Sequence, residues 1–264
     1  MRRIHAFELE DQSWFPAVLR DAGTAYLRFV GDRTGQADNV RPVIESALER
    51  SGESRILDLC SGGGGPVLGV ARALREAGRP VEVTLTDFFP NAPARQLVER
   101  GGDPASVYEA ESVDATRVPA ERPGLRTFFN SFHHFRPGTA RRILADAVSS
   151  GRPIAVVEVL SRSPLALLGI LFAPIVVFLA VPFLRPFRPA WLVFTYLLPV
   201  IPLFVLWDGL VSVLRIYDEA ELRSLAEGAD PEGRFDWRVE SIPMPPAPVP
   251  GIALVGVPRS RSGG

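Results

Sequence analysis

A short apolar segment followed by an acid and four consecutive glycines constrains this chain more than any other feature. Residues 55–66 read RILDLCSGGGGP, and a helical pattern begins directly after them. Glycine lets the backbone turn sharply and approach a ligand closely, because it has no Cβ. The N-terminal amides of the following helix point towards whatever lies on such a loop. The segment therefore predicts a nucleotide-type binding loop after the first strand of an α/β sheet.

The dinucleotide-binding pattern G-x-G-x-x-G fits this loop only in part. Gly62 and Gly64 occupy the first two glycine positions, but Val67 occupies the third. Asp58 also precedes the glycines, where that pattern needs no acid. An acid, a spacer, a small residue and alternating glycines instead resemble motif I of the class I S-adenosylmethionine (SAM)-dependent methyltransferases. Cys60 stands where that motif usually has its first glycine.

Later segments follow the order that this family requires. Alternating and β-branched residues predict further strands at 81–86, 106–108, 125–129, 154–159, 235–242 and 252–257. A proline-rich loop joins the last two, which suits the antiparallel pair at the end of the methyltransferase sheet. The resemblance therefore implies an α/β fold with a Rossmann-like sheet, mostly parallel with an antiparallel last strand.

The resemblance also implies which residues bind the methyl donor. Asp87, at the end of the second expected strand, would accept the ribose hydroxyls, as an acid about 20 residues after such a loop does for dinucleotides. Asp114 would lie by the adenine amine, and Asp58 would organise either the glycine loop or the methionine amino group. The residues expected at the donor are Asp58, Cys60, Ser61, Gly62, Gly64, Asp87, Phe88, Asp114, Ala115 and Asn130.

Two adjacent histidines, His133 and His134, follow the fourth expected strand and resemble a segment beside the methyl donor in many of these enzymes. Methyl transfer from a sulfonium mainly requires that donor and nucleophile are held in line, about 3 Å apart, in a dry site. Some acceptors must also lose a proton, and imidazole titrates nearest neutral pH. Both histidines are therefore candidate catalytic bases, with His134 preferred; the alternative is that both are structural.

Composition limits the partners and the compartment. The formal net charge is −1, so no basic field attracts nucleic acid. A single cysteine fits a reducing, cytoplasmic compartment, and no early apolar stretch suggests a secretory signal. With that one cysteine and an isolated His5, the sequence shows no metal-ligand spacing, and we expect no metal site.

Two uncharged, strongly apolar runs, Pro164 to Leu184 and Ala190 to Trp207, flank the segment RPFRP. As a helix, the first run would span roughly 31 Å, the thickness of a bilayer core. Interior prolines oppose continuous helices, and Arg185 and Arg188 in the connecting loop conflict with the positive-inside tendency. The hairpin could therefore span the membrane, lie in its interface, or form a lid or dimer surface over a lipophilic substrate tunnel.

Segments on either side of the expected core offer further candidate site residues. Residues 7–50 are expected to be helical and either to cover the donor pocket or to pack on the flank of the sheet. Trp14 and Phe15 would stack on a ligand or anchor in the core. Asp208 and Arg215, seven residues apart, would orient a substrate or, as we prefer, form an internal ion pair.

Together these patterns predict four parts: an N-terminal helical cap (1–50), a Rossmann-like SAM-binding core (51–162), a hydrophobic helical insertion (163–208), and the remaining core with the final strand pair (209–264). The predicted function is SAM-dependent O- or N-methylation of a lipophilic small molecule, in the cytoplasm and at the cytoplasmic membrane. The alternatives are an NAD(P)-dependent reductase and a non-catalytic membrane-surface protein with a nucleotide-type pocket. A homodimer through the insertion is a further candidate assembly.

Overall fold

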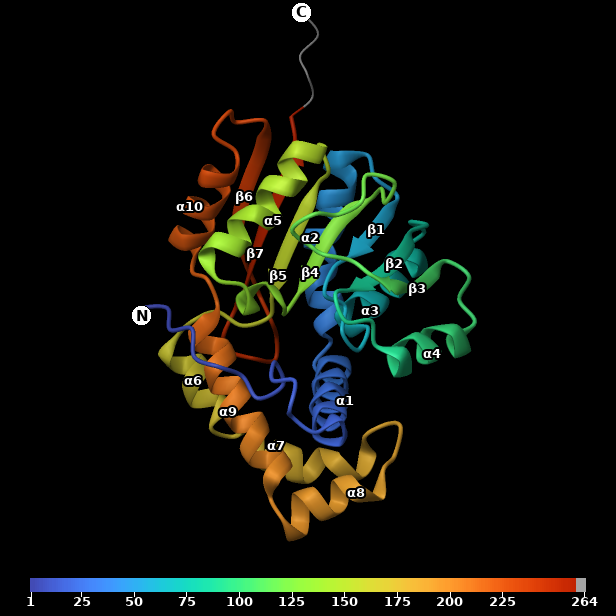
Figure 1. Ribbon diagram of the computed structural model, residues 1–264, viewed down its shortest axis with the longest axis vertical. Coiled ribbons are helices and arrows are strands. Elements are labelled where there is room, and N and C mark those ends of the chain that lie inside the picture. The colour runs from blue at the N-terminus through green and yellow to red at the C-terminus, as the bar shows by residue number, and fades with distance from the viewer. Residues whose placement is uncertain (260–264) are drawn as a thin grey trace, which may run out of the picture.

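A seven-stranded sheet forms the centre of the computed structural model, which describes residues 1–259 (Figure 1). Its strands are β1 (Arg55–Asp58), β2 (Glu82–Asp87), β3 (Ser106–Ser112), β4 (Leu125–Phe129), β5 (Ile154–Glu158), β6 (Phe235–Ile242) and β7 (Gly251–Pro258). Their spatial order is β3-β2-β1-β4-β5-β7-β6, and β7 runs antiparallel to both of its neighbours. Each strand predicted from the sequence is confirmed, as is the antiparallel final pair.

Helices cover both faces of this sheet (Figure 1). They are α2 (Gln36–Ser51), α3 (Gly65–Glu76), α4 (Ala92–Gly101), α5 (Pro137–Ser150) and α10 (Glu219–Ala229). Helix α1 (Ala17–Arg33) precedes α2 and lies off the sheet, and the short η1 (Phe132–His134) follows β4. Neighbouring strand residues point to opposite faces. Ile56 packs with α2 and α3, whereas Leu57 packs with α5 and α10. Burial on both faces explains the nearly uninterrupted apolar character of the central strands.

The apolar segment between β5 and α10 forms α6 (Pro164–Ile170), α7 (Ala173–Ala180), η2 (Val181–Phe183), α8 (Pro189–Leu192), η3 (Val193–Leu197) and α9 (Val200–Arg215). Within residues 1–259, one helix, Pro164–Phe183, is long and apolar enough to cross a membrane. The second apolar run is bent by 81° between Leu197 and Val200, next to Pro199. The first arm of the expected hairpin is therefore one apolar helical stretch, whereas the second arm is bent next to Pro199. The expected boundary at 208 also falls inside α9.

These apolar helices fold back onto α1. The Trp191 indole donates a hydrogen bond to the Val18 carbonyl at 2.9 Å, and Arg188 pairs with Asp21 at 2.8 Å. Deeper in the contact, the Phe204 ring packs directly on Gly23, and a Cβ added to this glycine would lie only 2.6 Å from the ring. The loop that carries the arginines is consequently attached to α1 rather than standing free at the far end of a hairpin.

The first sixteen residues are not helical, so the prediction of helix from residue 7 is wrong for 7–16. Pro16 immediately precedes α1 and disfavours helical geometry in the residue before it. Residues 3–11, which we call the N-terminal strap, instead run along α9 (Figure 1). Ile4 N–H donates to the Leu214 carbonyl at 3.0 Å, and the Trp207 indole donates to the Phe7 carbonyl at 3.1 Å. The backbone of the strap thus finds its partners on another element.

Candidate functional site

The glycine loop lies at the carboxyl end of β1, between that strand and α3. Gly62, Gly64 and Gly65 have φ values of 49°, 90° and 28°, in the region that favours glycine. Cys60 also has a positive φ, 58°. This backbone geometry explains why a glycine is usual at that position of the motif. A cysteine there retains the turn at some steric cost.

Asp58 supports the loop from below. Its buried carboxylate accepts hydrogen bonds from Ser61 Oγ at 2.6 Å and from Thr127 Oγ1 at 2.7 Å. Burial raises the pKa of Asp58 to about 7, against the opposing effect of these two hydroxyl donors. These contacts favour the loop-organising role for Asp58 over direct contact with the methionine group of a donor.

Asp87 lies at the end of β2, next to the loop. Its two carboxylate oxygens accept the backbone N–H groups of Gly62 at 2.8 Å and Phe89 at 2.9 Å. The Tyr108 hydroxyl donates to the Gly62 carbonyl at 3.0 Å, so strand β3 also fixes the loop. Each carboxylate oxygen can accept a second hydrogen bond. Asp87 therefore retains acceptor capacity for two further donors such as ribose hydroxyls.

The other predicted donor-site residues lie at the same edge of the sheet. Phe88 is half-exposed directly after β2, and Asp114 is exposed just after β3, beside the buried Ala115. Asp114 accepts hydrogen bonds from the backbone and hydroxyl of Thr116, both at 2.8 Å. Asn130, at a φ of 51° after β4, accepts the Val159 N–H at 2.9 Å. The parallel order of β1 to β4 explains why residues so far apart in sequence meet at one edge.

Helix α1 covers the glycine loop. A Cβ built on Gly63 would lie 2.2 Å from the Thr24 methyl, which shows how closely the Thr24 side chain packs on the loop backbone. Helix α2 instead packs on the face of the sheet through Val40, Ile44 and Leu48. The packing role on the sheet is therefore confirmed for α2, and the covering of a donor pocket by α1 stays a prediction.

His133 and His134 stack on one another, with ring centroids 4.3 Å apart. His133 is buried, and its Nδ1 lies 2.9 Å from Oε2 of Glu158 on β5. Oε1 of Glu158 also accepts the His133 backbone N–H at 3.0 Å. This double contact fixes both the backbone and the imidazole of His133.

His134 has a different carboxylate partner, on the N-terminal strap. Its Nδ1 lies 2.9 Å from Asp11 Oδ1 and 3.4 Å from Glu8 Oε2. Burial opposes protonation, but the hydrogen bond to Asp11 and the charges of Glu8 and Asp11 prevail and raise the pKa of His134 to about 9. A histidine that is already protonated at neutral pH is a poor proton acceptor. This environment counts against the preference for His134, and the base assignment stays a prediction.

Asp208 and Arg215 do not form the internal ion pair that we preferred. Asp208 accepts the backbone N–H groups of Leu9 at 2.7 Å and Glu10 at 3.0 Å. Arg215 pairs with Glu8 at 3.2 Å and with Asp11 at 2.7 Å. Both side chains thus use the N-terminal strap, which the sequence did not place beside α9.

The two aromatic residues before α1 differ in environment. Phe15 is buried and packs against Phe204, with ring centroids 5.2 Å apart, which supports its role as a core anchor. Trp14 is exposed. Neither has a structural feature that identifies it as a ligand contact, and their assignment to substrate binding stays a prediction.

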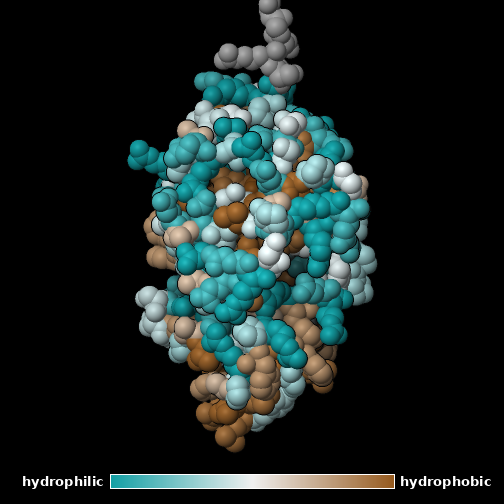
Figure 2. Space-filling model, turned by 90° about the vertical axis from the view of Figure 1, so that its right-hand side faces the viewer, coloured by the Kyte–Doolittle hydropathy of each residue, from teal (hydrophilic) through white to brown (hydrophobic). Residues whose placement is uncertain are grey.

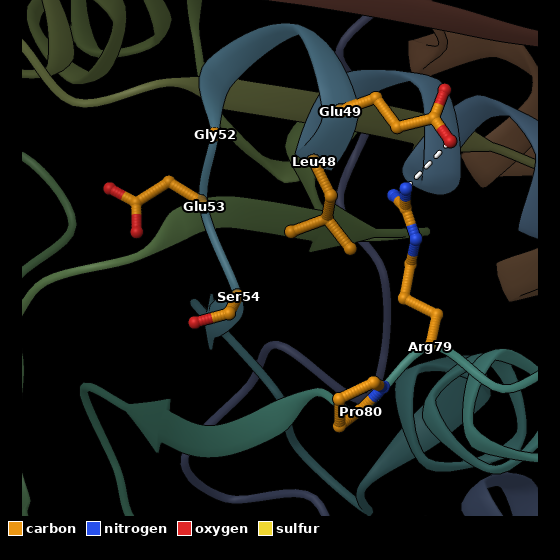
Figure 3. A pocket seen from close by; sticks show the side chains of 7 residues that line it. All are labelled: Leu48, Glu49, Gly52, Glu53, Ser54, Arg79 and Pro80. Carbon is orange, nitrogen blue, oxygen red and sulfur yellow. Dashed lines mark hydrogen bonds and ion pairs between the residues drawn. The ribbon is translucent and has the colours of Figure 1, made fainter.

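A shallow surface pocket of about 340 Å³ lies away from all these groups (Figure 3). Leu48 and Glu49 at the end of α2 line it together with Ser54, Arg79 and Pro80, which precede β1 and β2. Figure 3 shows the ion pair between Arg79 and Glu49, 2.6 Å long, at its side. Because this pocket is at the amino ends of β1 and β2, it lies at the opposite edge from the glycine loop.

Several side chains that build this edge were missed by the sequence reasoning. Thr127 and Tyr108 fix the glycine loop, and Glu8 and Asp11 contact the histidines. Thr127 and Tyr108 are ordinary strand residues, and no local pattern distinguishes them. Glu8 and Asp11 lie in the sequence ELED, which reads as an exposed acidic stretch.

No protein-family model and no curated sequence matches the chain significantly. Solved structures do match it. The SAM-dependent methyltransferase SibL superposes with a TM-score of 0.52 at 19% identity, over 88% of this chain and 58% of its own. Human N-acetylserotonin methyltransferase, solved with SAM, gives 0.52 at 13% identity, over 94% and 60%. The methyltransferase domain of bacterial CtHen1 gives 0.50 at 11% identity, over 83% and 97%.

This chain thus spans somewhat under two thirds of SibL and of the human enzyme, but nearly all of the CtHen1 domain. Identities this low establish the architecture alone. That architecture agrees with the strand order, the antiparallel β7 and the glycine loop after β1. The protein therefore has the Rossmann-like fold of the class I SAM-dependent methyltransferases.

Proposed function

We propose that this protein is a SAM-dependent methyltransferase that methylates a hydroxyl, carboxyl or amine of a lipophilic small molecule. The observation that carries the proposal is the glycine loop with Asp87 beside it, at the carboxyl edge of a sheet with methyltransferase strand order. The loop offers close backbone approach, and Asp87 offers free acceptor capacity at the position expected for ribose. The name of each of the three similar structures includes methyltransferase, which supports the same activity.

The chemistry needs little more than a preorganised site. A sulfonium donor has a neutral leaving group, so alignment of donor and acceptor and exclusion of water account for most of the acceleration. Helix α1 covers the loop through Thr24 and would help to exclude water. Where the acceptor must lose a proton, His133 is held by Glu158 at 2.9 Å, whereas the raised pKa of His134 leaves it protonated.

Binding of S-adenosylhomocysteine (SAH), the spent donor, tests the proposal. We expect isothermal titration to show micromolar binding of SAH and none of NADH. Asp87→Ala should weaken SAH binding at least tenfold, because two hydroxyl contacts are lost. Asp236→Ala is the matched control and should bind SAH normally, because this acid lies on β6 and pairs with Arg50.

The same titration separates the alternatives. Binding of NADH alone would make the protein a reductase and overturn the methyltransferase proposal. Failure of both ligands to bind, with and without lipid vesicles, would favour the non-catalytic membrane-surface role. Unchanged SAH affinity in Asp87→Ala would contradict the ribose assignment while leaving the donor itself established.

The lipophilic character of the acceptor is inferred from the apolar helices α6 to α9. Many of their large side chains are exposed; Leu179, Phe183, Leu197 and Leu203 are each more than 60% accessible. Figure 2 shows these hydrophobic residues gathered at one end of the molecule. A patch of this kind marks a contact with lipid, ligand or protein. We propose that it lies in the cytoplasmic membrane interface, where a lipophilic acceptor would be concentrated.

The attachment of the arginine-containing loop to α1 favours an interfacial arrangement over a spanning hairpin. Arg188 pairs with Asp21, so a spanning arrangement would require this ion pair to break or to enter the bilayer. Helices that lie in the interface keep the pair near water. A homodimer through the same surface is the alternative, and it would appear as a dimer in lipid-free solution.

A further inference from the structure

We propose that Glu8, His133 and His134 form a binding site for one divalent transition-metal ion, with Zn²⁺ as the best-matched probe. Ligand atoms of these three residues lie within 4.8 Å of one another. Glu8 comes from the N-terminal strap and both histidines from η1, so more than 120 residues of chain separate the two parts. Two imidazoles and one carboxylate are a donor set that binds Zn²⁺ and other first-row divalent metals.

Among residues 1–259, two buried ligand atoms of this group find no hydrogen-bond partner: Glu8 Oε2 and His133 Nε2. Glu8 is fully buried, and His133 is 5% exposed. A buried polar atom without a partner costs about 1–3 kcal/mol, and more when it is charged. A metal ion between them would satisfy both atoms at once.

Each carboxylate oxygen of Glu8 faces one of the two histidines, and Oε1 also has partners on α9. Its Oε1 accepts a hydrogen bond from Ser212 Oγ at 3.0 Å and pairs with Arg215 at 3.2 Å. Its Oε2 lies 3.4 Å from His134 Nδ1, and Oε1 lies 3.7 Å from His133 Nε2. Ligands of a tetrahedral zinc ion are about 3.3 Å apart, given Zn–N and Zn–O bonds of about 2.0–2.2 Å. The two distances from Glu8 to the imidazoles are close to this spacing, and His134 Nδ1 would exchange its contact with Asp11 for the metal ion.

Glu158 supplies the second feature of a built metal site. It accepts the Nδ1–H of His133 at 2.9 Å, which would leave the lone pair on Nε2, the atom that faces Glu8. Histidine ligands in metal sites generally donate their other N–H to a carboxylate or carbonyl in this way. The contact fixes both the tautomer and the ring orientation before any metal binds.

Charge also favours a divalent cation. Three carboxylates contact the two imidazoles, namely Glu8, Asp11 and Glu158, while Arg215 is the guanidinium among them. Three carboxylates against one guanidinium leave two negative charges in excess, and a proton on His134 offsets one of them. Buried charge of this kind requires compensation. Zn²⁺ would supply it, and Arg215 would continue to hold Glu8 Oε1 and Asp11.

Metal binding to tag-free protein stripped with a chelator tests the site directly. Isothermal titration should show one Zn²⁺ per chain, and Mg²⁺, which prefers oxygen ligands and octahedral geometry, should not bind here. Glu8→Gln and His133→Ala should each weaken Zn²⁺ binding at least tenfold. Glu158→Gln should weaken it about 10–100-fold, as outer-shell partners of metal sites do.

His5→Ala is the matched control, because His5 is the third histidine of the chain and lies outside the group. It should bind Zn²⁺ as the unaltered protein does. Zn²⁺ should also raise the thermal midpoint of the unaltered protein and of His5→Ala, but not that of Glu8→Gln. Circular dichroism establishes that each variant is folded.

The proposal is overturned if the unaltered protein binds no Zn²⁺, a result that needs no variant. It is equally overturned if binding persists in both Glu8→Gln and His133→Ala, because the ion would then lie elsewhere. These outcomes are independent of SAH binding, so the metal site and the methyltransferase proposal can fail separately.

Discussion

Asp58 illustrates how a single residue in this protein combines burial with hydrogen bonding. Its carboxylate is enclosed beneath the glycine loop and holds Ser61 and Thr127. Desolvation disfavours the charged form, and the pKa rises to about 7, compared with about 3.9 in an unfolded chain. Between these values the folded protein retains a proton that the unfolded chain has lost. Stability should therefore fall as pH rises from about 4 to about 7.

We expect Asp58→Asn to remove this part of the pH dependence. The unaltered protein should lose up to about 1.4 kcal/mol of unfolding free energy for each pH unit in this window, relative to the variant. Urea unfolding at several pH values from 4.5 to 7.5 measures the difference. Asp230→Asn is the control: hydrogen bonds from Arg234, Phe235 and Trp237 overcome burial and lower the pKa of Asp230, so it titrates below this window. Parallel pH profiles for the unaltered protein and Asp58→Asn would contradict the assignment.

Gly63 shows a second kind of constraint at residue scale, the close packing of a side chain on the loop backbone. A Cβ at this position would meet the Thr24 methyl at 2.2 Å. Gly63→Ala should therefore displace α1 from the loop, lower stability by about 1–3 kcal/mol and weaken SAH binding. Thr24→Ser, which removes the methyl but keeps the hydroxyl, should restore much of both losses in the double variant. Losses that persist in the double variant would place the clash elsewhere.

At the scale of elements, the junction between the apolar helices and the core depends on α10. Asp218 caps this helix, and its side chain and that of Glu221 form a complete capping box. Arg162, which follows β5 and is almost fully buried, pairs with both acids. One cap therefore fixes the start of α10 and the exit of the chain from β5.

Asp218→Ala should lower the unfolding free energy by about 1–2 kcal/mol, because it removes a cap and one partner of a buried arginine. Glu219→Ala changes the neighbouring acid, which forms an exposed pair with Arg223. That control should cost at most about 0.5 kcal/mol. Chemical denaturation of the two variants measures both values, and equal losses would contradict the capping argument.

At the scale of the whole molecule, the exposed hydrophobic residues are concentrated at one end. The sheet and the helices that cover it carry the glycine loop and have a largely polar surface, and α6 to α9 extend from them as a largely apolar body (Figures 1 and 2). The stretch Pro164–Phe183 has a mean hydropathy of 2.7 but is only 28% buried. Helix α1 connects the two parts, because it contacts the glycine loop at Gly63 and the apolar helices at Phe204.

We expect the protein to float with vesicles of phosphatidylcholine and phosphatidylglycerol. Replacing Leu179, Phe183 and Leu197 with serine should reduce the bound fraction at least tenfold, because roughly 1.5 kcal/mol or more of apolar burial is lost at each position. The control is Val107→Ser on β3, which removes an exposed apolar side chain that lies outside α6 to α9. Normal vesicle binding by the triple variant would contradict the membrane assignment. So would a dimer of the unaltered protein in lipid-free solution that the triple variant does not form.

The sequence predicted the strands and the glycine loop from local patterns: alternation in the strands, consecutive glycines before a helix, and acids at strand ends. The mostly parallel sheet with an antiparallel final pair was implied by the resemblance to the methyltransferases, and the strand pairing confirms it. The prediction of helix in residues 7–16 was wrong for a local reason as well, because Pro16 precedes α1. The second apolar run is bent next to Pro199, a feature that hydrophobicity alone does not indicate.

What the tertiary structure decided lies in contacts between segments distant in sequence. Neither Glu8 nor Arg215 has a local pattern that predicts the other, yet the strap along α9 brings both to the two histidines. The pairing of Asp208 with strap amides, the raised pKa of His134 and the candidate metal site all follow from that one placement. The physical reason is that the sequence determines which polar and charged groups need partners once they are buried. The partner can come from any segment that the fold brings within reach.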